Sequence, residues 1–242
     1  MRLFLLCLLM TALLAGCTTS TSAVAPPSSS TASSELPLDI RWVRRSAEHQ
    51  AAYAQTYRAA SAYLSAMADT ISTDRWAVVL DADETLIDNS LYQQERAEQG
   101  LGFSPESWNA WTLREEATAL PGAVAFTRQV AELGGRVVVV TNRDDAVCEA
   151  TRRNLQAVAI EASAILCQTD TGDKNPRFAL VEQGYGDLPP LRIVMWVGDN
   201  IQDFPGLSQQ VRFGGQAALS EFGGRFWLLP NPMYGSWTRN AE

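Results

Sequence analysis

Five short, uninterrupted apolar runs constrain the fold of this chain more than any other feature of its sequence. The strands that they predict lie at residues 76–80, 136–140, 164–167, 193–197 and 225–229, of which the second and the last begin with an arginine that precedes the apolar run. A strand that is apolar on both sides is buried on both of its faces, as in parallel sheets covered by helices above and below. The sequence therefore predicts an α/β fold in which a parallel sheet is flanked by helices.

The stretches between these runs have the composition of helices. Residues 40–70 contain no Gly or Pro and are rich in Ala, which predicts one long helix or two shorter ones. A helix over 121–133 begins at Pro121 and ends before Gly134, residue types typical of helix starts and ends. Further helices are predicted at 104–114, 146–158 and 176–183.

The first 16 residues have the pattern of a secretory signal peptide, in which Arg2 precedes an apolar stretch shorter than the roughly 20 residues of a membrane span. Its end, Leu14-Ala15-Gly16-Cys17, resembles the lipobox of bacterial lipoproteins, which implies cleavage before Cys17 and attachment of lipid to its sulfur. The alternative is an ordinary signal peptide followed by an incidental cysteine. A lipidated chain would be anchored in the cell envelope, and Thr18 favours the outer membrane in a Gram-negative cell.

Residues 17–37 are rich in Ser, Thr, Ala and Pro and nearly free of charge. Such a segment buries too little apolar surface to offset its ordering entropy, so we expect a flexible tether. The remaining chain, residues 38–242, is long enough for one domain with its own core. The formal net charge is −8. Since no basic stripe is present to release counterions from a phosphate backbone, the composition argues against a nucleic-acid polymer as partner.

The four cysteines and the single histidine limit the kinds of site that the chain can hold. Cys7 lies within the predicted signal peptide and Cys17 at its end. For Cys148 and Cys167 the sequence leaves two alternatives open, a disulfide or two buried thiols, and their spacing matches no metal-site pattern. His49 lies in a helical stretch and is interpreted as a surface or packing residue. One histidine also excludes any mechanism that needs two of them.

Polar clusters follow three of the predicted strands directly. The carboxyl ends of parallel strands meet at one edge of a sheet, and ligands bind in the crevice outside that edge. Two like charges about 4 Å apart repel by roughly 4 kcal/mol at an effective dielectric near 20, so acidic residues gathered there need a cation or a chemical purpose. The clusters contain Asp81 and Asp83 after 76–80, Thr141 and Asn142 after 136–140, and Asp199 and Asp203 after 193–197.

Four motifs in this order resemble those of the haloacid dehalogenase (HAD) superfamily of phosphotransferases. They are DADET, the Thr of TNR, Lys174 and GDNIQD. The DADETLIDNS extension, the SAEHQAAYAQTY helix, KNPRF and the closing LLPNPMYGSW are similar to class C acid phosphatases, a group that includes bacterial lipoprotein acid phosphatases. The resemblance covers residues 40–239. It implies a Rossmann-like, HAD-like core with a small helical cap, formed by the N-terminal helices and an insertion at about 91–120.

The resemblance implies a catalytic role for five residues. Asp81 would be the nucleophile that forms an aspartyl-phosphate, which divides one difficult displacement into two easier ones. Asp83 would donate a proton to the leaving oxygen and later accept one from water. Thr141 and Asn142 would donate hydrogen bonds to the phosphoryl oxygens. Lys174 would pair with Asp81 and the phosphate and cancel charge that grows in the transition state.

Mg²⁺ is the cofactor that the resemblance implies. The side chain of Asp81, the carbonyl oxygen of Asp83 and Asp199 would hold the ion, with Asp203 in contact with it directly or through water. A hard divalent cation would neutralise the acidic residues and draw phosphate toward the nucleophile.

The implied substrates are small phosphomonoesters, with nucleoside monophosphates favoured. Trp108 and Tyr234 lie where lipoprotein acid phosphatases place two aromatic rings that sandwich a base, and such stacking would contribute roughly 1–3 kcal/mol. The alternative is that both rings only pack in the core, as we expect for Trp111. Asp88 and Asn89 also match the family pattern and are interpreted as structural supports.

Three other interpretations compete with this one. A receiver-type signalling domain combines acidic residues, a Thr and a Lys on a parallel sheet, but its acidic pair lies far upstream of the phosphorylated Asp. A storage protein on the same fold is expected to have lost the nucleophile, whereas Asp81 is present. An envelope-anchored binding lipoprotein, for haem for example, is disfavoured by the single histidine. Homodimers are common in the family, although the residues themselves do not indicate one.

Overall fold

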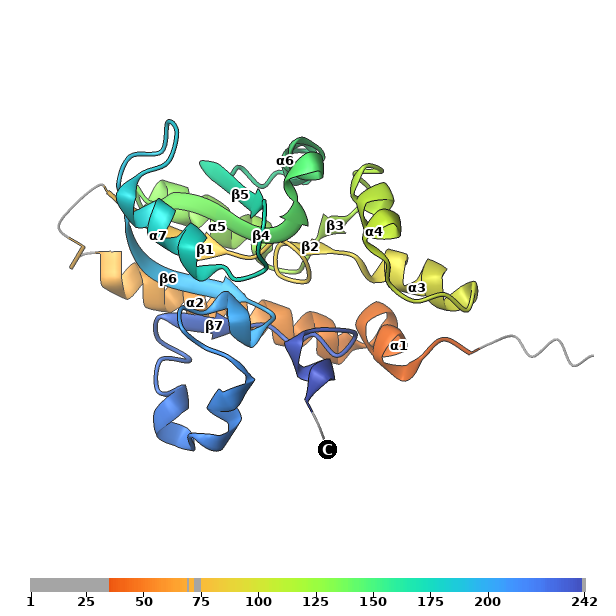
Figure 1. Ribbon diagram of the computed structural model, residues 1–242. Coiled ribbons are helices and arrows are strands. Elements are labelled where there is room, and N and C mark those ends of the chain that lie inside the picture. Colours follow the sequence, from red (N-terminus) through yellow and green to blue (C-terminus); the bar gives the residue numbers. More distant parts are fainter. Residues whose placement is uncertain (1–34, 69, 72–74, 241–242) are drawn as a thin grey trace, which may run out of the picture. The chain divides into compact units, whose positions relative to one another are not determined.

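A five-stranded parallel sheet forms the centre of the fold (Figure 1). The computed structural model describes residues 35–68, 70–71 and 75–240. The strands stand in the order β5-β4-β1-β6-β7, and each neighbouring pair is parallel, which confirms the predicted α/β sheet. Their bounds are β1 (Trp76–Leu80), β4 (Arg136–Asp144), β5 (Ala164–Gln168), β6 (Arg192–Gly198) and β7 (Phe226–Leu228).

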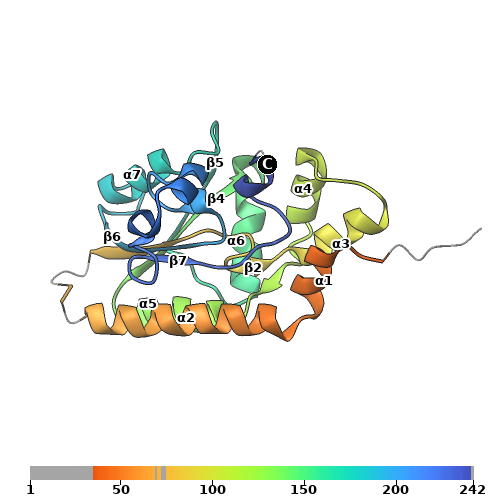
Figure 2. The ribbon, with the colours of Figure 1, turned by 90° about the horizontal axis from the view of Figure 1, so that it is seen from below.

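Helices cover both faces of the sheet. Figure 2 shows α2 and α5 on one side of the sheet and α7 on the other. Leu155 of α6 belongs to the same apolar core as Tyr57 of α2 and Phe126 of α5, so α6 packs on the face that carries α2 and α5. The bounds of these helices are α2 (Ala47–Ala68), α5 (Ala123–Glu132), α6 (Cys148–Ala157) and α7 (Asn175–Gln183).

Alternate side chains of β1 belong to two separate cores. Val78 and Leu80 pack in the core that contains α2 and α5, whereas Val79 packs with Phe178 and Val181 of α7. Successive side chains of a strand point to opposite faces, and every residue of β1 is buried. This explains why the strand is a continuous apolar run.

Three short helices lie together at one end of the sheet in both views (Figures 1 and 2). They are α1 (Leu38–Arg45), α3 (Ser90–Glu98) and α4 (Pro105–Thr112). A two-stranded antiparallel pair, β2 (Ile87–Asp88) and β3 (Thr118–Ala119), joins the two ends of the segment that carries α3 and α4. Short 3-10 helices complete the chain: η1 (Asp145–Val147), η2 (Ile201–Asp203), η3 (Gln209–Phe213), η4 (Gln216–Leu219) and η5 (Ser236–Arg239).

The structure defines the limits of two elements that the sequence alone did not determine. Of the two alternatives predicted for residues 40–70, the structure has two helices. Ser46 has an extended backbone between them, and its Oγ accepts a hydrogen bond from the amide of His49 at 3.1 Å. The strand predicted at 136–140 continues to Asp144, so that Thr141 and Asn142 lie within β4 rather than in a loop after it.

Two questions about single side chains are answered by the packing. Cys148 and Cys167 form a disulfide, with their Cα atoms 5.9 Å apart, which decides between the alternatives that the sequence left open. His49 is a packing residue, since it is 4% exposed and its ring contacts those of Trp42 and Tyr53.

The predicted signal peptide and Cys17 lie outside the described residues, as does most of the predicted tether. Among the helices that the structure does describe, none is both long enough and apolar enough to cross a membrane.

Candidate active site

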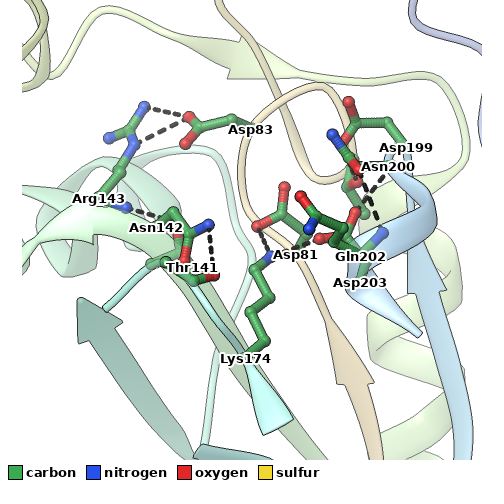
Figure 3. A network of polar contacts seen from close by, with 12 residues as sticks. Asp81, Asp83, Thr141, Asn142, Arg143, Lys174, Asp199, Asn200, Gln202 and Asp203 are labelled. Carbon is green, nitrogen blue, oxygen red and sulfur yellow. Dashed lines mark hydrogen bonds and ion pairs between the residues drawn. The ribbon is translucent and has the colours of Figure 1, made fainter. Parts of the chain in front are cut away.

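Three carboxylates, which we call the acidic cluster, meet at the carboxyl edge of the sheet (Figure 3). Asp81 follows β1, Asp199 follows β6, and Asp203 ends η2. One oxygen of each carboxylate lies within 4.8 Å of the others. They meet because β1 and β6 are hydrogen-bonded neighbours and end at the same edge.

One ammonium group is shared by two members of the acidic cluster. Nζ of Lys174 lies 2.5 Å from Oδ1 of Asp81 and 2.7 Å from Oδ1 of Asp203. Lys174 stands immediately before α7, and its side chain is 4% exposed. Because an unpaired charge is costly in such a buried place, the ammonium and the two carboxylates depend on one another.

The pKa values indicate that negative charge is in excess here. Burial raises the pKa of Asp199 well above its ordinary value, and the carboxylates of Asp203 and Asp81 raise it further. Burial also raises the pKa of Asp203, to about 6, although the ammonium of Lys174 opposes the shift. Burial alone would lower the pKa of Lys174, but the two carboxylates outweigh it and the pKa is raised. A neighbouring cation would relieve this repulsion.

The acidic cluster has the composition of a site for a hard divalent cation. Its donors are all carboxylate oxygens, which Mg²⁺ and Ca²⁺ prefer. With all three groups ionised, Lys174 cancels one negative charge, and a divalent cation would cancel the other two. Hydrogen bonds from outside the cluster hold two of the carboxylates in place, since Asn231 Nδ2 donates to Asp199 and the amide of Asn200 to Asp203, both at 2.8 Å.

The carboxylate of Asp83 has partners of its own (Figure 3). Nε and Nη2 of Arg143 lie 2.9 and 2.8 Å from Oδ1 of Asp83, and Nδ2 of Asn89 donates to the same oxygen at 2.9 Å. Burial raises the pKa of Asp83, Arg143 opposes this shift, and the charge of Asp81 adds to it. The two aspartates of the D-x-D motif therefore lie in different electrostatic surroundings.

Helix α2 fixes the loop that carries these aspartates. The hydroxyl of Tyr53 donates to the carbonyl oxygen of Glu84, and that of Tyr57 donates to the carbonyl oxygen of Thr85 at 2.7 Å. Glu84 has φ of +50°, which is uncommon for a residue with a side chain. The amide of Asn89 donates to Oε1 of Glu84 at 2.8 Å and helps to hold this turn.

The end of β4 contributes hydrogen-bonding groups that are already engaged. Oγ1 of Thr141 is buried and accepts from the amide of Arg143 at 3.1 Å, while Nδ2 of Asn142 donates to the carbonyl oxygen of Gly172 at 3.0 Å. Arg177 of α7 donates to the carbonyl oxygen of Thr141 and, at 2.5 Å, to Oδ1 of Asn142. The contact with Gly172 uses one of the two N–H groups of the Asn142 amide, so the second could donate to a phosphoryl oxygen.

A cavity of about 620 Å³ opens onto both groups of carboxylates. Trp108 of α4 and Tyr234 also line it, with their ring centroids 6.4 Å apart and their planes at 72°. Two rings that sandwich a base would lie parallel to it, whereas these two meet edge to face. Most of the residues that the sequence assigned to the site line this cavity: Asp81, Asp83, Trp108, Asn142, Lys174, Asp199, Asp203 and Tyr234. Thr141 does not line it.

Comparison with known proteins agrees with this site. A family model described as HAD superfamily, subfamily IIIB (acid phosphatase), matches residues 13–237. The chain belongs to this family. The class C acid phosphatase from Bacillus anthracis is 33% identical, with a TM-score of 0.74 over 82% of this chain and 84% of that one. Its structure with tungstate bound matches with 32% identity and a TM-score of 0.73 over the same shares of the two chains. The HAD-like fold and the class C resemblance are thereby confirmed.

Two curated relatives are more distant. Acid phosphatase 1 of Solanum lycopersicum is 28% identical over 66% of this chain, and vegetative storage protein 1 of Arabidopsis thaliana is 25% identical over 64%. The matches span 58% and 54% of the lengths of these two relatives. HAD phosphatases generally use a divalent metal ion, and the acidic cluster supplies suitable ligands.

Several residues of this acid-phosphatase site were missed by sequence reasoning. Arg143 and Arg177 lie inside the TNR and KNPRF segments, but only neighbouring residues of those segments were given roles. Asn231 belongs to the closing segment and Glu84 to DADET. The available signal was a charged residue inside three of the matched motifs and an amide inside the fourth, and the missing information was which group each of them contacts.

Gly198, the last residue of β6, leaves room for Asp203. A Cβ atom on Gly198 would lie 2.4 Å from Cβ and from Oδ2 of Asp203, so an alanine there must displace this carboxylate. We expect Gly198→Ala to weaken the binding of Mg²⁺ or Mn²⁺ roughly 10- to 100-fold, measured by calorimetric titration. Gly102→Ala is the control, because a Cβ there meets nothing within 4 Å. Unchanged affinity in Gly198→Ala would contradict the assignment of Asp203 to the metal site.

Proposed function

We propose that this protein is a Mg²⁺-dependent phosphomonoesterase, an acid phosphatase that works through an aspartyl-phosphate on Asp81. The observation that carries the proposal is that two carboxylates of one motif line the same cavity but are held by different side chains. Asp81 pairs with the ammonium of Lys174 beside the acidic cluster, whereas Asp83 lies apart and has a raised pKa. One carboxylate is thus suited to attack and the other to donate a proton.

In the first half of the reaction, a carboxylate oxygen of Asp81 attacks phosphorus. The bond between phosphorus and the leaving oxygen breaks with its electron pair on that oxygen, which takes the proton of Asp83. In the second half, water attacks the phosphorus of the aspartyl-phosphate, and Asp83 accepts the proton of the water. Inorganic phosphate leaves, and the carboxylate of Asp81 is regenerated.

The remaining residues of the site hold charge and orientation during these steps. Lys174 keeps Asp81 in place and offsets the charge of the transferring group. Asp81, Asp199 and Asp203 would hold Mg²⁺, together with the carbonyl oxygen of Asp83. When bound, the ion would supply positive charge that draws the phosphoryl group to Asp81. The Bacillus anthracis enzyme, whose structure has been solved with the oxyanion tungstate bound, supports an oxyanion-binding role for this site.

Nucleoside monophosphates are the substrates that the cavity favours. Trp108 lines the cavity together with the carboxylates, and stacking of a base on its indole ring would contribute roughly 1–3 kcal/mol. Because Tyr234 meets Trp108 edge to face, we propose stacking on Trp108 with Tyr234 rotating to cover the second face of the base.

The nucleophile provides the first test of this function. We expect Asp81→Asn to lower kcat for p-nitrophenyl phosphate and AMP by more than about 10³-fold, because an amide cannot form the acyl phosphate. We expect chelation of divalent metal to abolish the wild-type activity and added Mg²⁺ to restore it. Asp187→Asn changes an exposed aspartate outside the cavity and serves as the control. Full activity in Asp81→Asn, or in excess chelator, would refute the mechanism, whereas a wild-type protein without activity on either ester would refute the proposed function.

The aromatic ring of Trp108 provides a test of substrate class. We expect Trp108→Ala to lower kcat/KM for AMP about 5- to 150-fold, the equivalent of the stacking energy, and to change kcat/KM for ribose 5-phosphate much less. Phe213→Ala is the matched control, because this ring is 71% exposed and lies outside the cavity. An equal decrease for both substrates would show that Trp108 serves packing and not recognition of the base.

We further propose that the protein is anchored by lipid at Cys17 to the cell envelope, in the outer membrane if the cell is Gram-negative. The support is the sequence Leu14-Ala15-Gly16-Cys17 at the end of an apolar leader. In a bacterial host fed with labelled palmitate, we expect label in the wild-type protein and in Cys7→Ser, and none in Cys17→Ser. Incorporation of label into Cys17→Ser would exclude this anchor.

A further inference from the structure

The carboxylate of Asp83 is held by only one of its two oxygens. Three nitrogen atoms surround Oδ1: Nε of Arg143 and Nδ2 of Asn89 donate hydrogen bonds to it, both at 2.9 Å, and Nη2 of Arg143 forms an ion pair with it at 2.8 Å. Oδ2 accepts no hydrogen bond from any residue that the structure describes. Figure 3 shows both contacts with Arg143 converging on the same oxygen. An oxygen that accepts two hydrogen bonds and lies in contact with a third nitrogen has no room for a proton of its own.

Arg143 is itself fixed by buried partners. Its side chain has no exposed surface, and Nη2 donates to Oδ1 of Asn89 at 3.0 Å. That same Asn89 oxygen accepts from Nε1 of Trp111 at 2.8 Å, so the orientation of the amide is determined. The guanidinium carbon also lies 5.8 Å from the centre of the Trp108 ring, which lines the cavity. The guanidinium therefore reaches Asp83 from a rigid support.

We propose that Arg143, together with Asn89, is a positioning residue that holds Asp83 by Oδ1, so that Oδ2 is the atom that delivers the proton to the leaving oxygen. This inference rests on the proposed phosphatase function. Asp83 lines the cavity and 13% of its side chain is exposed, so a substrate can reach it there. As the bond between phosphorus and the leaving oxygen breaks, its electron pair stays on that oxygen, the proton moves from Oδ2 to it, and Asp83 is left as a carboxylate.

The need for this proton depends on the leaving group. A p-nitrophenolate ion is stable without a proton, whereas an alkoxide such as that of glycerol is not. General acid catalysis contributes typically 10²- to 10⁴-fold, and only the ester of the poor leaving group requires it in full. A residue that only stabilised the fold would affect both esters equally.

The experiment compares kcat/KM for p-nitrophenyl phosphate and for glycerol 2-phosphate in Arg143→Lys and Arg143→Gln. The quotient kcat/KM reports the steps up to the aspartyl-phosphate, so hydrolysis of that shared intermediate does not enter. We expect kcat/KM for glycerol 2-phosphate to fall at least about 10-fold more than for p-nitrophenyl phosphate. Asp83→Asn should show the same bias. Arg128→Gln, an exposed arginine of α5, should show neither effect.

The outcomes separate this inference from the proposed function. An equal decrease for both esters in the Arg143 variants, with a bias in Asp83→Asn, would overturn the positioning role and leave the phosphatase function intact. A wild-type protein that hydrolyses neither ester would instead contradict the proposed function. If both Arg143 variants fail to fold, as judged by circular dichroism, Asn89→Ser provides a second test, because it removes the Asn89 donor to Oδ1. This variant must show the same bias between the two esters to a smaller degree. If it shows none, the proposal fails.

Discussion

The crowding of negative charge at the carboxyl edge of the sheet is the constraint on which the rest of this structure depends. Parallel strands deliver Asp81 and Asp199 side by side, and a short helix adds Asp203. Such a group is stable in a buried place only when cations neutralise it. Lys174 supplies one positive charge, and a divalent ion would supply the remaining positive charge. The repulsion that destabilises these carboxylates is also what would favour the binding of a divalent cation. The bound cation would in turn attract phosphate.

The second charge pair of the site is separate from the first. Arg143 and Asn89 hold Asp83, and the tyrosines of α2 fix the turn that directly follows it. Because their partners differ, two carboxylates that stand two residues apart in one motif can serve different roles. A long helix on the far side of the sheet thus contributes to the chemistry without lining the cavity.

The sheet and the acidic cluster could be predicted from the sequence for the same reason. Continuous apolar runs identify strands buried on both faces, and the first polar residues after such strands meet at one edge. The network around Arg143 could not be predicted in this way. Asn89 and Arg143 come from segments far apart in the chain, and an isolated arginine carries no periodic signal that identifies its carboxylate. The pairing of Cys148 with Cys167 was undecided because their spacing suits both a disulfide and free thiols.

That disulfide has a consequence for how the site is assembled. Cys148 begins the helix that follows β4, and Cys167 lies in β5, just before the loop that leads to Lys174. The covalent link therefore joins the segments that supply the guanidinium for Asp83 and the ammonium for Asp81. Disulfides form and persist in oxidising compartments. A copy of the chain that folded where thiols stay reduced would lack this covalent link between the segments that carry its two cations, so the alignment of its opposite charges would depend on where the chain matured.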